Sequence, residues 1–281
     1  MLRAPAPRPA DTVITSRRPT LRLSSFRAQR YPLKFVFQPL IDVGSSSLLG
    51  FEALTRFADG LGPAQHFQAA RDEGRLVELE LRAIQGILEA SALLPTGVLV
   101  TLNASGSTIE SFAGSSLRLD PRLVWGLELN EQSDPAVCAR ARQLADAMGC
   151  LLLIDDAGVA HATRERIVQL HPDIVKLDRT MITGYEQDLR IRTLVDSLLQ
   201  AANSIGAKTL AEGVETIGQL QLVERLGFDY AQGFHFSPGR PGEEIGVMLQ
   251  DLDRRLGIGI PAPLTGVRTL GAREPDHRQY P

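Results

Sequence analysis

The chain has 281 residues, of which 43% are hydrophobic and 22% charged, and its formal net charge is −3. This size and composition are typical of a globular protein, with room for one large α/β barrel or two small domains. The slight negative charge argues against a protein that coats nucleic acid. No apolar run approaches the roughly 20 residues that a membrane span needs.

The two ends of the chain differ in composition from the middle. Residues 1–30 are rich in Pro and Ser and carry Arg at seven positions against one Asp, without the apolar core of a secretory signal. Organelle transit peptides share this composition, but we favour a disordered basic arm. Residues 257–281 are rich in Gly and Pro and predict a disordered tail. We expect a reducing, cytoplasmic compartment, with Cys138 and Cys150 as buried small hydrophobes rather than a disulfide or metal pair.

Between the tails, the pattern alternates between strands and helices. Residues 34–41 and 48–56 predict two strands, and the short turn at 45–47 favours a hairpin over a parallel crossover. Helices are predicted at 63–73 and 76–94. The later strands are predicted at 98–102, 123–129, 151–155, 174–177, 209–211 and near Tyr230. The later helices are predicted at 135–148, 164–170, 189–205, 217–226 and 243–256. Repeated β–α order requires a parallel sheet, and about eight such units close best as a barrel.

The stretch from Leu151 to Gly158 is the most informative of these elements. Four aliphatic residues predict a strand buried on both faces, and Asp155 and Asp156 end it. Two neighbouring ionised carboxylates cannot both lie in the core, so at least one should meet a cation. Taken alone, the pair fits a helix cap beside a solvated Asp somewhat better.

Polar side chains end most of the predicted strands, and in a parallel barrel these ends converge on one rim, where active sites are built. They are Glu52, Asn103, Glu128, Asp155, Asp156, Lys176, Glu212 and Gln232. Independent capping explains each of them alone but explains the set poorly. His161, His171 and His235 lack ligand spacing and are expected on the surface or in packing.

Carboxylates with an amide oxygen form a hard ligand set that suits Mg²⁺ or Mn²⁺. Adjacent carboxylates can hold two metals about 3.5–4 Å apart, the arrangement that cleaves phosphodiesters with water. A lysine late on a barrel strand can orient the attacking water or neutralise phosphate charge.

These residues resemble the motifs of the EAL domain, the cyclic di-GMP phosphodiesterase of bacterial signalling. The likeness runs from about residue 31 to 256. Its motifs are Glu52-Ala53-Leu54 with Arg56, residues 37–40, 102–105 and 128–131, the Asp155-Asp156 pair, Lys176, residues 211–216, and Gln232-Gly233-Phe234 with Phe236 and Pro238. Asn130 stands where the family has Thr. The resemblance implies a TIM-like (β/α)8 barrel with an antiparallel first strand, and hydrolysis of cyclic di-GMP to linear pGpG.

The resemblance also implies a role for each matching residue. Two Mg²⁺ or Mn²⁺ ions would be held by Glu52, Asn103, Glu128, Asp155, Asp156 and Glu212. The catalytic residues would be Lys176, which positions the water, with Glu52, Glu212 and Gln232. The nucleotide would contact Gln38, Leu54, Arg56, Asp173 and Glu215. Glu131 would anchor the loop after the Asp pair, and the protein would form a homodimer.

That loop is where the chain departs from the family. The family has Phe-Gly-Thr-Gly-Tyr-Ser-Ser after the two Asp, whereas residues 157–163 read Ala-Gly-Val-Ala-His-Ala-Thr. In the family this loop shapes the second metal site and the dimer contact, so the change favours a cyclic di-GMP receptor that acts through a regulatory protein partner. The complete ligand set favours the enzyme. A protein-interaction scaffold without a nucleotide role is the third alternative.

Overall fold

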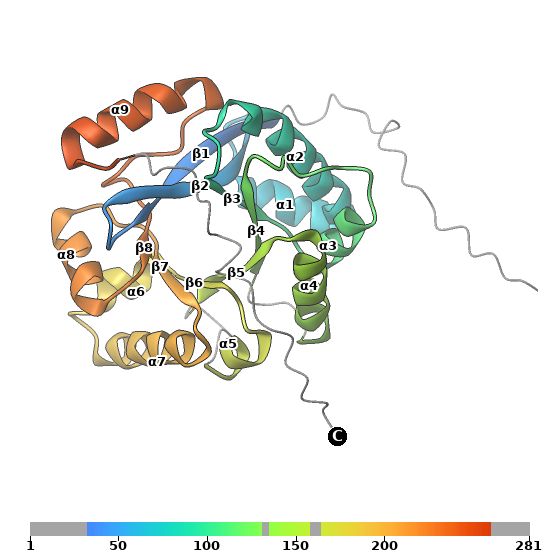
Figure 1. Cartoon of the computed structure of the whole chain (residues 1–281). Helices are drawn as coiled ribbons and strands as arrows, with labels where there is room; N and C mark the ends of the chain where they lie inside the picture. Colours follow the sequence, from blue (N-terminus) through green and yellow to red (C-terminus); the bar gives the residue numbers. More distant parts are fainter. Residues whose placement is uncertain (1–32, 131–134, 158–163, 260–281) are drawn as a thin grey trace, which may run out of the picture.

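Eight strands form a closed barrel in chain order, and helices surround it (Figure 1). The structure is a computed structural model that describes residues 33–130, 135–157 and 164–259, with the backbone alone at Asn130, Pro135 and Asp156. The predicted α/β barrel is confirmed. The predicted arm at 1–30 and most of the predicted tail lie outside the described residues.

The first two strands form the predicted hairpin. β1 (Leu33–Asp42) is antiparallel to β2 (Ser47–Phe57) and to the last strand, whereas the other neighbouring strands are parallel. The parallel strands after β2 are β3 (Leu99–Asn103), β4 (Val124–Asn130), β5 (Leu151–Ala157), β6 (Ile174–Leu177), β7 (Lys208–Ala211) and β8 (Tyr230–Ala231). The antiparallel first strand is therefore confirmed.

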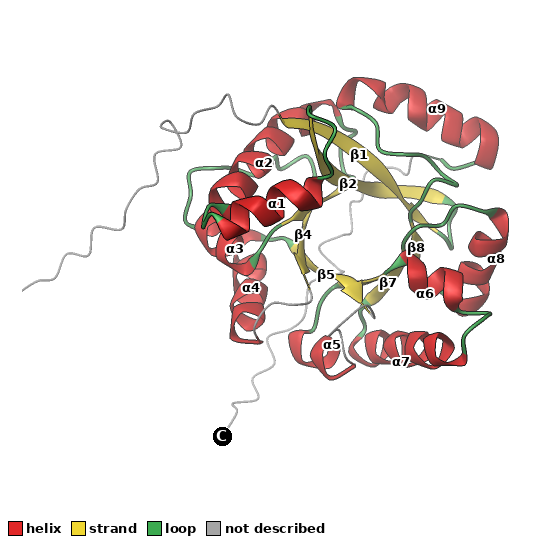
Figure 2. Cartoon of the chain, turned by 180° about the vertical axis from the view of Figure 1, so that it is seen from behind, coloured by secondary structure: helices red, strands yellow, loops and turns green. Residues whose placement is uncertain are grey.

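The helices form the outer layer, as Figure 2 shows from behind. They are α1 (Pro63–Asp72), α2 (Leu76–Ala90), α3 (Gly106–Ala113), α4 (Pro135–Met148), α5 (Arg164–Leu170), α6 (Arg179–Gly184), α7 (Leu189–Ile205), α8 (Ile217–Leu226) and α9 (Ile245–Leu256). Two short 3-10 helices replace parts of the predicted helices. Ser91–Leu93 lies at the end of the helix predicted at 76–94, and Gly242–Glu244 lies at the start of the one predicted at 243–256. None of the helices in the described ranges is long and apolar enough to cross a membrane.

Two short helices, α3 and α6, were not predicted from the sequence. α3 has Gly, Ser and Thr in its first turn, which are weak helix formers. α6 has only six residues and begins after Asp178, whose carboxylate accepts a hydrogen bond from the Thr180 amide. Neither segment is long enough to show a clear helical periodicity in the sequence.

Alternation of side chains along the strands separates two cores. One set of side chains packs outward under the helices, and the other points into the barrel. The inner set forms its own apolar cluster of Leu40, Leu49, Leu99, Leu151, Leu153, Ile174, Leu210 and Tyr230. These residues lie mainly toward the amino ends of the parallel strands. Two-residue steps along the same strands lead from Leu153 to Asp155, from Ile174 to Lys176 and from Leu210 to Glu212. The apolar inner layer therefore supports a polar layer at the carboxyl ends.

Gly126 makes room for this arrangement inside the barrel. A Cβ atom at this position would lie 2.7 Å from Leu153 Cδ1 and 3.1 Å from Thr101 Cγ2. The absence of a side chain lets Leu153 fill the space directly below the polar layer.

Candidate functional site

The ammonium group of Lys176 lies at the centre of the polar layer. Its side chain is 1% exposed, and its four acidic neighbours come from four other strands or strand ends. Nζ lies 2.6 Å from Glu128 Oε2, 2.7 Å from Glu212 Oε1, 2.9 Å from Asp155 Oδ1 and 3.6 Å from Glu52 Oε2. The predicted convergence of these strand ends on one rim is present in the structure.

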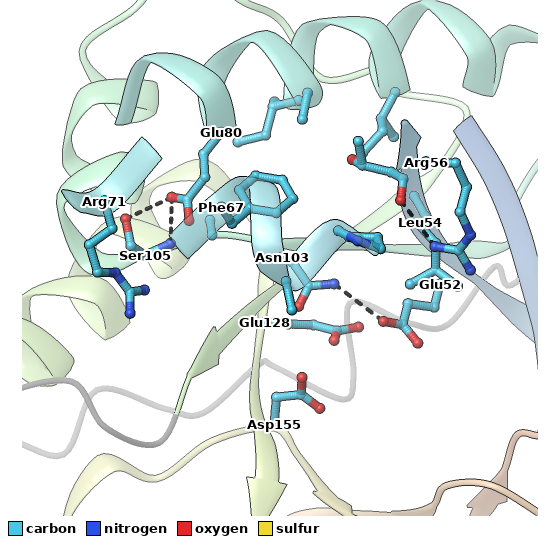
Figure 3. Close-up of a pocket in the computed structure, with 18 residues that line it drawn as sticks. Glu52, Leu54, Arg56, Phe67, Arg71, Glu80, Asn103, Ser105, Glu128 and Asp155 are labelled. Carbon is cyan, nitrogen blue, oxygen red and sulfur yellow. Dashed lines mark hydrogen bonds between the residues drawn. The ribbon is translucent and has the colours of Figure 1, made fainter. Parts of the chain in front are cut away.

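Two amide side chains complete the cluster. Asn103 Nδ2 donates to Glu52 Oε1 at 3.2 Å, and Gln232 Nε2 donates to Glu52 Oε2 at 2.7 Å. Both donations leave the amide oxygens available as acceptors, and Gln232 Oε1 is buried without a hydrogen-bond partner in the described part of the chain. Figure 3 shows Asn103, Glu52, Glu128 and Asp155 facing one another.

The cluster holds more negative than positive charge, because one ammonium faces four carboxyl groups. Burial raises the pKa of Glu128 to about 8, and repulsion from Glu52 adds to this shift while Lys176 opposes it. Burial also raises the pKa of Glu212. Burial alone would lower the pKa of Lys176, but the surrounding carboxylates, Asp155 foremost, hold it well above its usual range. Lys176 therefore stays charged, and the carboxyl groups still lack positive charge.

This shortage of positive charge and the type of donor atoms fit a divalent cation. Carboxylate and amide oxygens are hard ligands, and Glu128 Oε1 is buried without a hydrogen-bond partner among the described residues. In the same ranges, no three His, Cys, Asp or Glu side chains are already arranged to hold a metal. Lys176 Nζ lies between these carboxylates, which would have to turn partly away from it.

A cavity of about 380 Å³ opens beside the cluster, a size within the usual range of ligand pockets. It extends from Glu52 and Asp155 along β2 to α1 and α2, where Phe67 and Arg71 line its outer part (Figure 3). The lining includes Leu54 and Arg56, which follow Glu52 at two-residue steps and so share its face of β2. These two predicted nucleotide contacts therefore lie next to the predicted metal ligands.

Two further predicted nucleotide contacts lie near the same rim. Gln38 is directly opposite Glu52 in the antiparallel pair, and its Nε2 donates to Ser237 O at 3.4 Å. Glu215 follows β7 and accepts a hydrogen bond of 2.6 Å from Arg179, which follows β6.

The structure contradicts the prediction for Asp173. This residue precedes β6, at the amino end of the barrel, and its parity along the strand is opposite to that of Lys176. Its carboxylate accepts hydrogen bonds from Arg142 at 2.6 Å and from the Leu152 amide at 2.8 Å. Asp173 thus connects α4 and β5 at the amino end of the barrel, away from the cavity. Asp178 lies at the carboxyl end of β6 instead.

Part of the predicted second metal site is outside the described residues. Glu131, His161 and the loop at 158–163 all lie there, and only the backbone of Asp156 is described. Ala157 is described: it ends β5, pairs with Leu177 and is fully buried. At the position where the family has an aromatic anchor, this chain therefore has a small core residue.

Two polar residues near the site had no predicted role. Asp178 follows Lys176 by two residues, so the strand periodicity alone places it on the same face. Glu80 on α2 is 9% exposed and lines the cavity. The sequence does contain a sign of this burial: Glu80 lies four residues from both Leu76 and Ile84, and therefore on the apolar side of the helix.

Comparison with known proteins gives a family and a fold. A family model described as the EAL domain matches residues 23–239. PdeL of Escherichia coli, a cyclic di-GMP phosphodiesterase, is 24% identical over 78% of this chain and 66% of its own length. The chain spans 33%, 29% and 66% of the lengths of the first three curated relatives that it matches.

Solved structures agree with this match. PaMucR phosphodiesterase, in complex with c-di-GMP, has a TM-score of 0.67 and 25% identity, covering 76% of this chain and 99% of PaMucR. Klebsiella pneumoniae BlrP1, in complex with manganese and cy-diGMP, has a TM-score of 0.64 and 21% identity, covering 75% of this chain and 57% of BlrP1. Because the family model covers most of the chain, this protein belongs to the EAL domain family.

Proposed function

We propose that the protein is a phosphodiesterase that uses a divalent cation to hydrolyse cyclic di-GMP to linear pGpG. The observation that carries the proposal is the set of four carboxyl groups around one buried ammonium at the barrel rim, next to a cavity. Membership of the EAL family and the activity named for PdeL and PaMucR support the choice of substrate.

The cation would be Mg²⁺ or Mn²⁺, held by Glu52, Asn103, Glu128 and Asp155. The manganese named for BlrP1 supports this choice of metal. Asp156 and Glu212 are the candidates for a second ion. A cation bound in such a site withdraws charge from a phosphate and makes water more acidic.

The chain's own residues have distinct tasks in this proposal. Lys176 stays protonated and lies among the carboxylates, so it can orient a water or neutralise charge that develops on the phosphate. Gln232 holds Glu52 in place through its 2.7 Å hydrogen bond and presents its free oxygen to the same space. Arg56 lies at the exposed end of the same face of β2 and is available to a phosphate or a base edge.

The experiment is incubation of the purified protein with cyclic di-GMP and Mg²⁺ or Mn²⁺, followed by chromatographic separation of the nucleotides. We expect pGpG to form, excess chelator to abolish its formation, and Ca²⁺ to block it because Ca²⁺ prefers longer bonds and looser geometry. Full activity in excess chelator would contradict the metal assignment.

A receptor for cyclic di-GMP is the second candidate, favoured by the small buried Ala157 and by the altered sequence after it. Calorimetric titration with cyclic di-GMP separates the two functions, because a receptor binds the nucleotide without forming pGpG. It would then require a protein partner.

The homodimer and the cytoplasmic location remain predictions. Cys138 and Cys150 are both buried, as expected for small hydrophobic residues.

A further inference from the structure

Glu80 holds the segment that follows β3. Its Oε2 accepts two hydrogen bonds from Ser105, one of 2.9 Å from the backbone N–H and one of 2.7 Å from the hydroxyl. Figure 3 shows both bonds at the end of the cavity away from Arg56. A single buried carboxylate oxygen on α2 thus accepts from both hydrogen-bond donors of one residue that is 25 positions away.

The Ser105 side chain does not form the hydrogen bond that an N-cap serine usually forms. Ser105 precedes α3 at the N-cap position, where a serine hydroxyl usually accepts from an amide of the first turn. Here its side chain makes no such bond. Instead, Glu80 Oε2 accepts from the Ser105 N–H at the amino end of α3, where the helix dipole favours a carboxylate.

Asn103 is the last residue of β3 and directly precedes this segment, which is held from two sides. The Ala104 N–H donates to Glu128 O at 3.1 Å, which ties the segment to β4. Ser105 ties it to α2 through Glu80. Asn103 itself contacts the acidic cluster around Lys176 through its 3.2 Å hydrogen bond to Glu52. Only Ala104 separates Asn103 from Ser105, so release of Ser105 would leave Asn103 fixed on one side only.

We propose that Glu80 is a positioning residue for the metal site: through Ser105 it sets the place of the Asn103 amide oxygen. The inference rests on the proposed function, because it assumes that Asn103 is a metal ligand. Partners that orient a ligand typically change metal affinity by roughly 10–100-fold when they are removed.

The test measures Mn²⁺ affinity by calorimetry, without nucleotide, in four variants. Glu80→Ala should weaken Mn²⁺ binding by about tenfold or more. Glu80→Gln should retain much of the affinity, because its amide oxygen can still accept from Ser105. The matched control is Glu89→Ala, which removes an exposed carboxylate from the same helix and should leave the affinity unchanged. Ser105→Ala removes one of the two hydrogen bonds to Glu80, together with the 3.0 Å contact of the hydroxyl with Thr108, and should weaken binding by an intermediate factor. It also carries the test if Glu80→Ala does not fold.

A double-mutant cycle with Asn103→Ala separates positioning from general stability. In the Asn103→Ala background, Glu80→Ala should cause no further loss of Mn²⁺ affinity. An equal loss in both backgrounds, or wild-type affinity in Glu80→Ala and Ser105→Ala, would overturn the inference. If the wild-type protein binds no Mn²⁺, the metal site and this inference both fail. Mn²⁺ binding without hydrolysis of cyclic di-GMP removes only the proposed enzyme and leaves the Glu80 test intact.

Discussion

Replacement of Lys176 by Met tests how the barrel interior tolerates its acidic cluster. Met keeps an unbranched apolar side chain beside Leu153 and Ile174 but removes the ammonium that contacts four carboxyl groups. Removing one partner of a buried charge pair costs about 3–5 kcal/mol of unfolding free energy, because the remaining charge stays buried. For a domain of this size each kcal/mol shifts Tm by roughly 2–4 °C. We therefore expect the metal-free variant to melt roughly 6–20 °C below the wild type at pH 8.

The loss should depend on pH. The pKa of Glu128 is raised to about 8, so at lower pH this carboxyl takes up a proton and no longer needs the ammonium. At pH 5 the difference in Tm should therefore shrink.

The assay is thermal unfolding in excess chelator at both pH values. The control is Lys208→Met, which removes an ammonium 2.6 Å from Asp229 on a side chain that is 40% exposed. Such a partly exposed pair contributes at most about 1 kcal/mol. A Lys176→Met variant that is as stable as the wild type at pH 8 would refute the described electrostatics.

Three further outcomes follow from the same geometry. Glu52→Ala should abolish hydrolysis of cyclic di-GMP yet keep a cooperative thermal transition, since it removes a carboxylate that repels the buried Glu128. Loss of the transition would make Glu52 a structural residue. Mn²⁺ binding near pH 7 should release protons, because Glu128 is then largely protonated, and affinity should rise toward pH 8. Calorimetry in buffers of different ionisation enthalpy measures this release, and its absence would contradict the raised pKa. Ala157→Phe should lower unfolding free energy by about 1–3 kcal/mol, because the fully buried Ala157 leaves no room. An unchanged Tm would show that the position can accept the aromatic side chain of the family.

The metal-free protein should also lose stability as pH rises. A carboxyl group whose pKa is higher in the folded state binds a proton that the unfolded chain has already lost. For Glu128 this window runs from its ordinary value of 4.5 to about 8, and stability falls with rising pH across it. Denaturant unfolding at a series of pH values measures the slope, and Mn²⁺ should remove it.

The period of two along strands explains what the sequence could predict about the site. Once the strand at 151–155 was recognised, Asp155 had to share a face with Leu151 and Leu153. The same step placed Lys176 above Ile174 and Glu212 above Leu210. The same rule excludes Asp173 from the site, because Asp173 precedes the strand and its side chain points to the face opposite to that of Lys176.

Contacts between distant segments could not be predicted from these patterns. From the sequence alone, Glu80 is an ordinary charged residue on an amphipathic helix. Its contact with Ser105 at the start of α3 is seen only in the structure. α3 itself has weak helix formers, so its conformation depends on packing and on the anchored Ser105. The four short ion-pair distances around Lys176 likewise depend on closure of the barrel, which no single motif specifies.

The most direct test of the metal site is diffraction from crystals of the protein soaked in Mn²⁺, with data collected at the manganese absorption edge. We predict an anomalous peak within coordination distance of oxygen atoms of Glu52, Asn103, Glu128 and Asp155, with at least one of these carboxylates moved away from Lys176. A crystal without a peak at the barrel rim, in which Lys176 keeps its contacts with all four carboxyl groups, would contradict it.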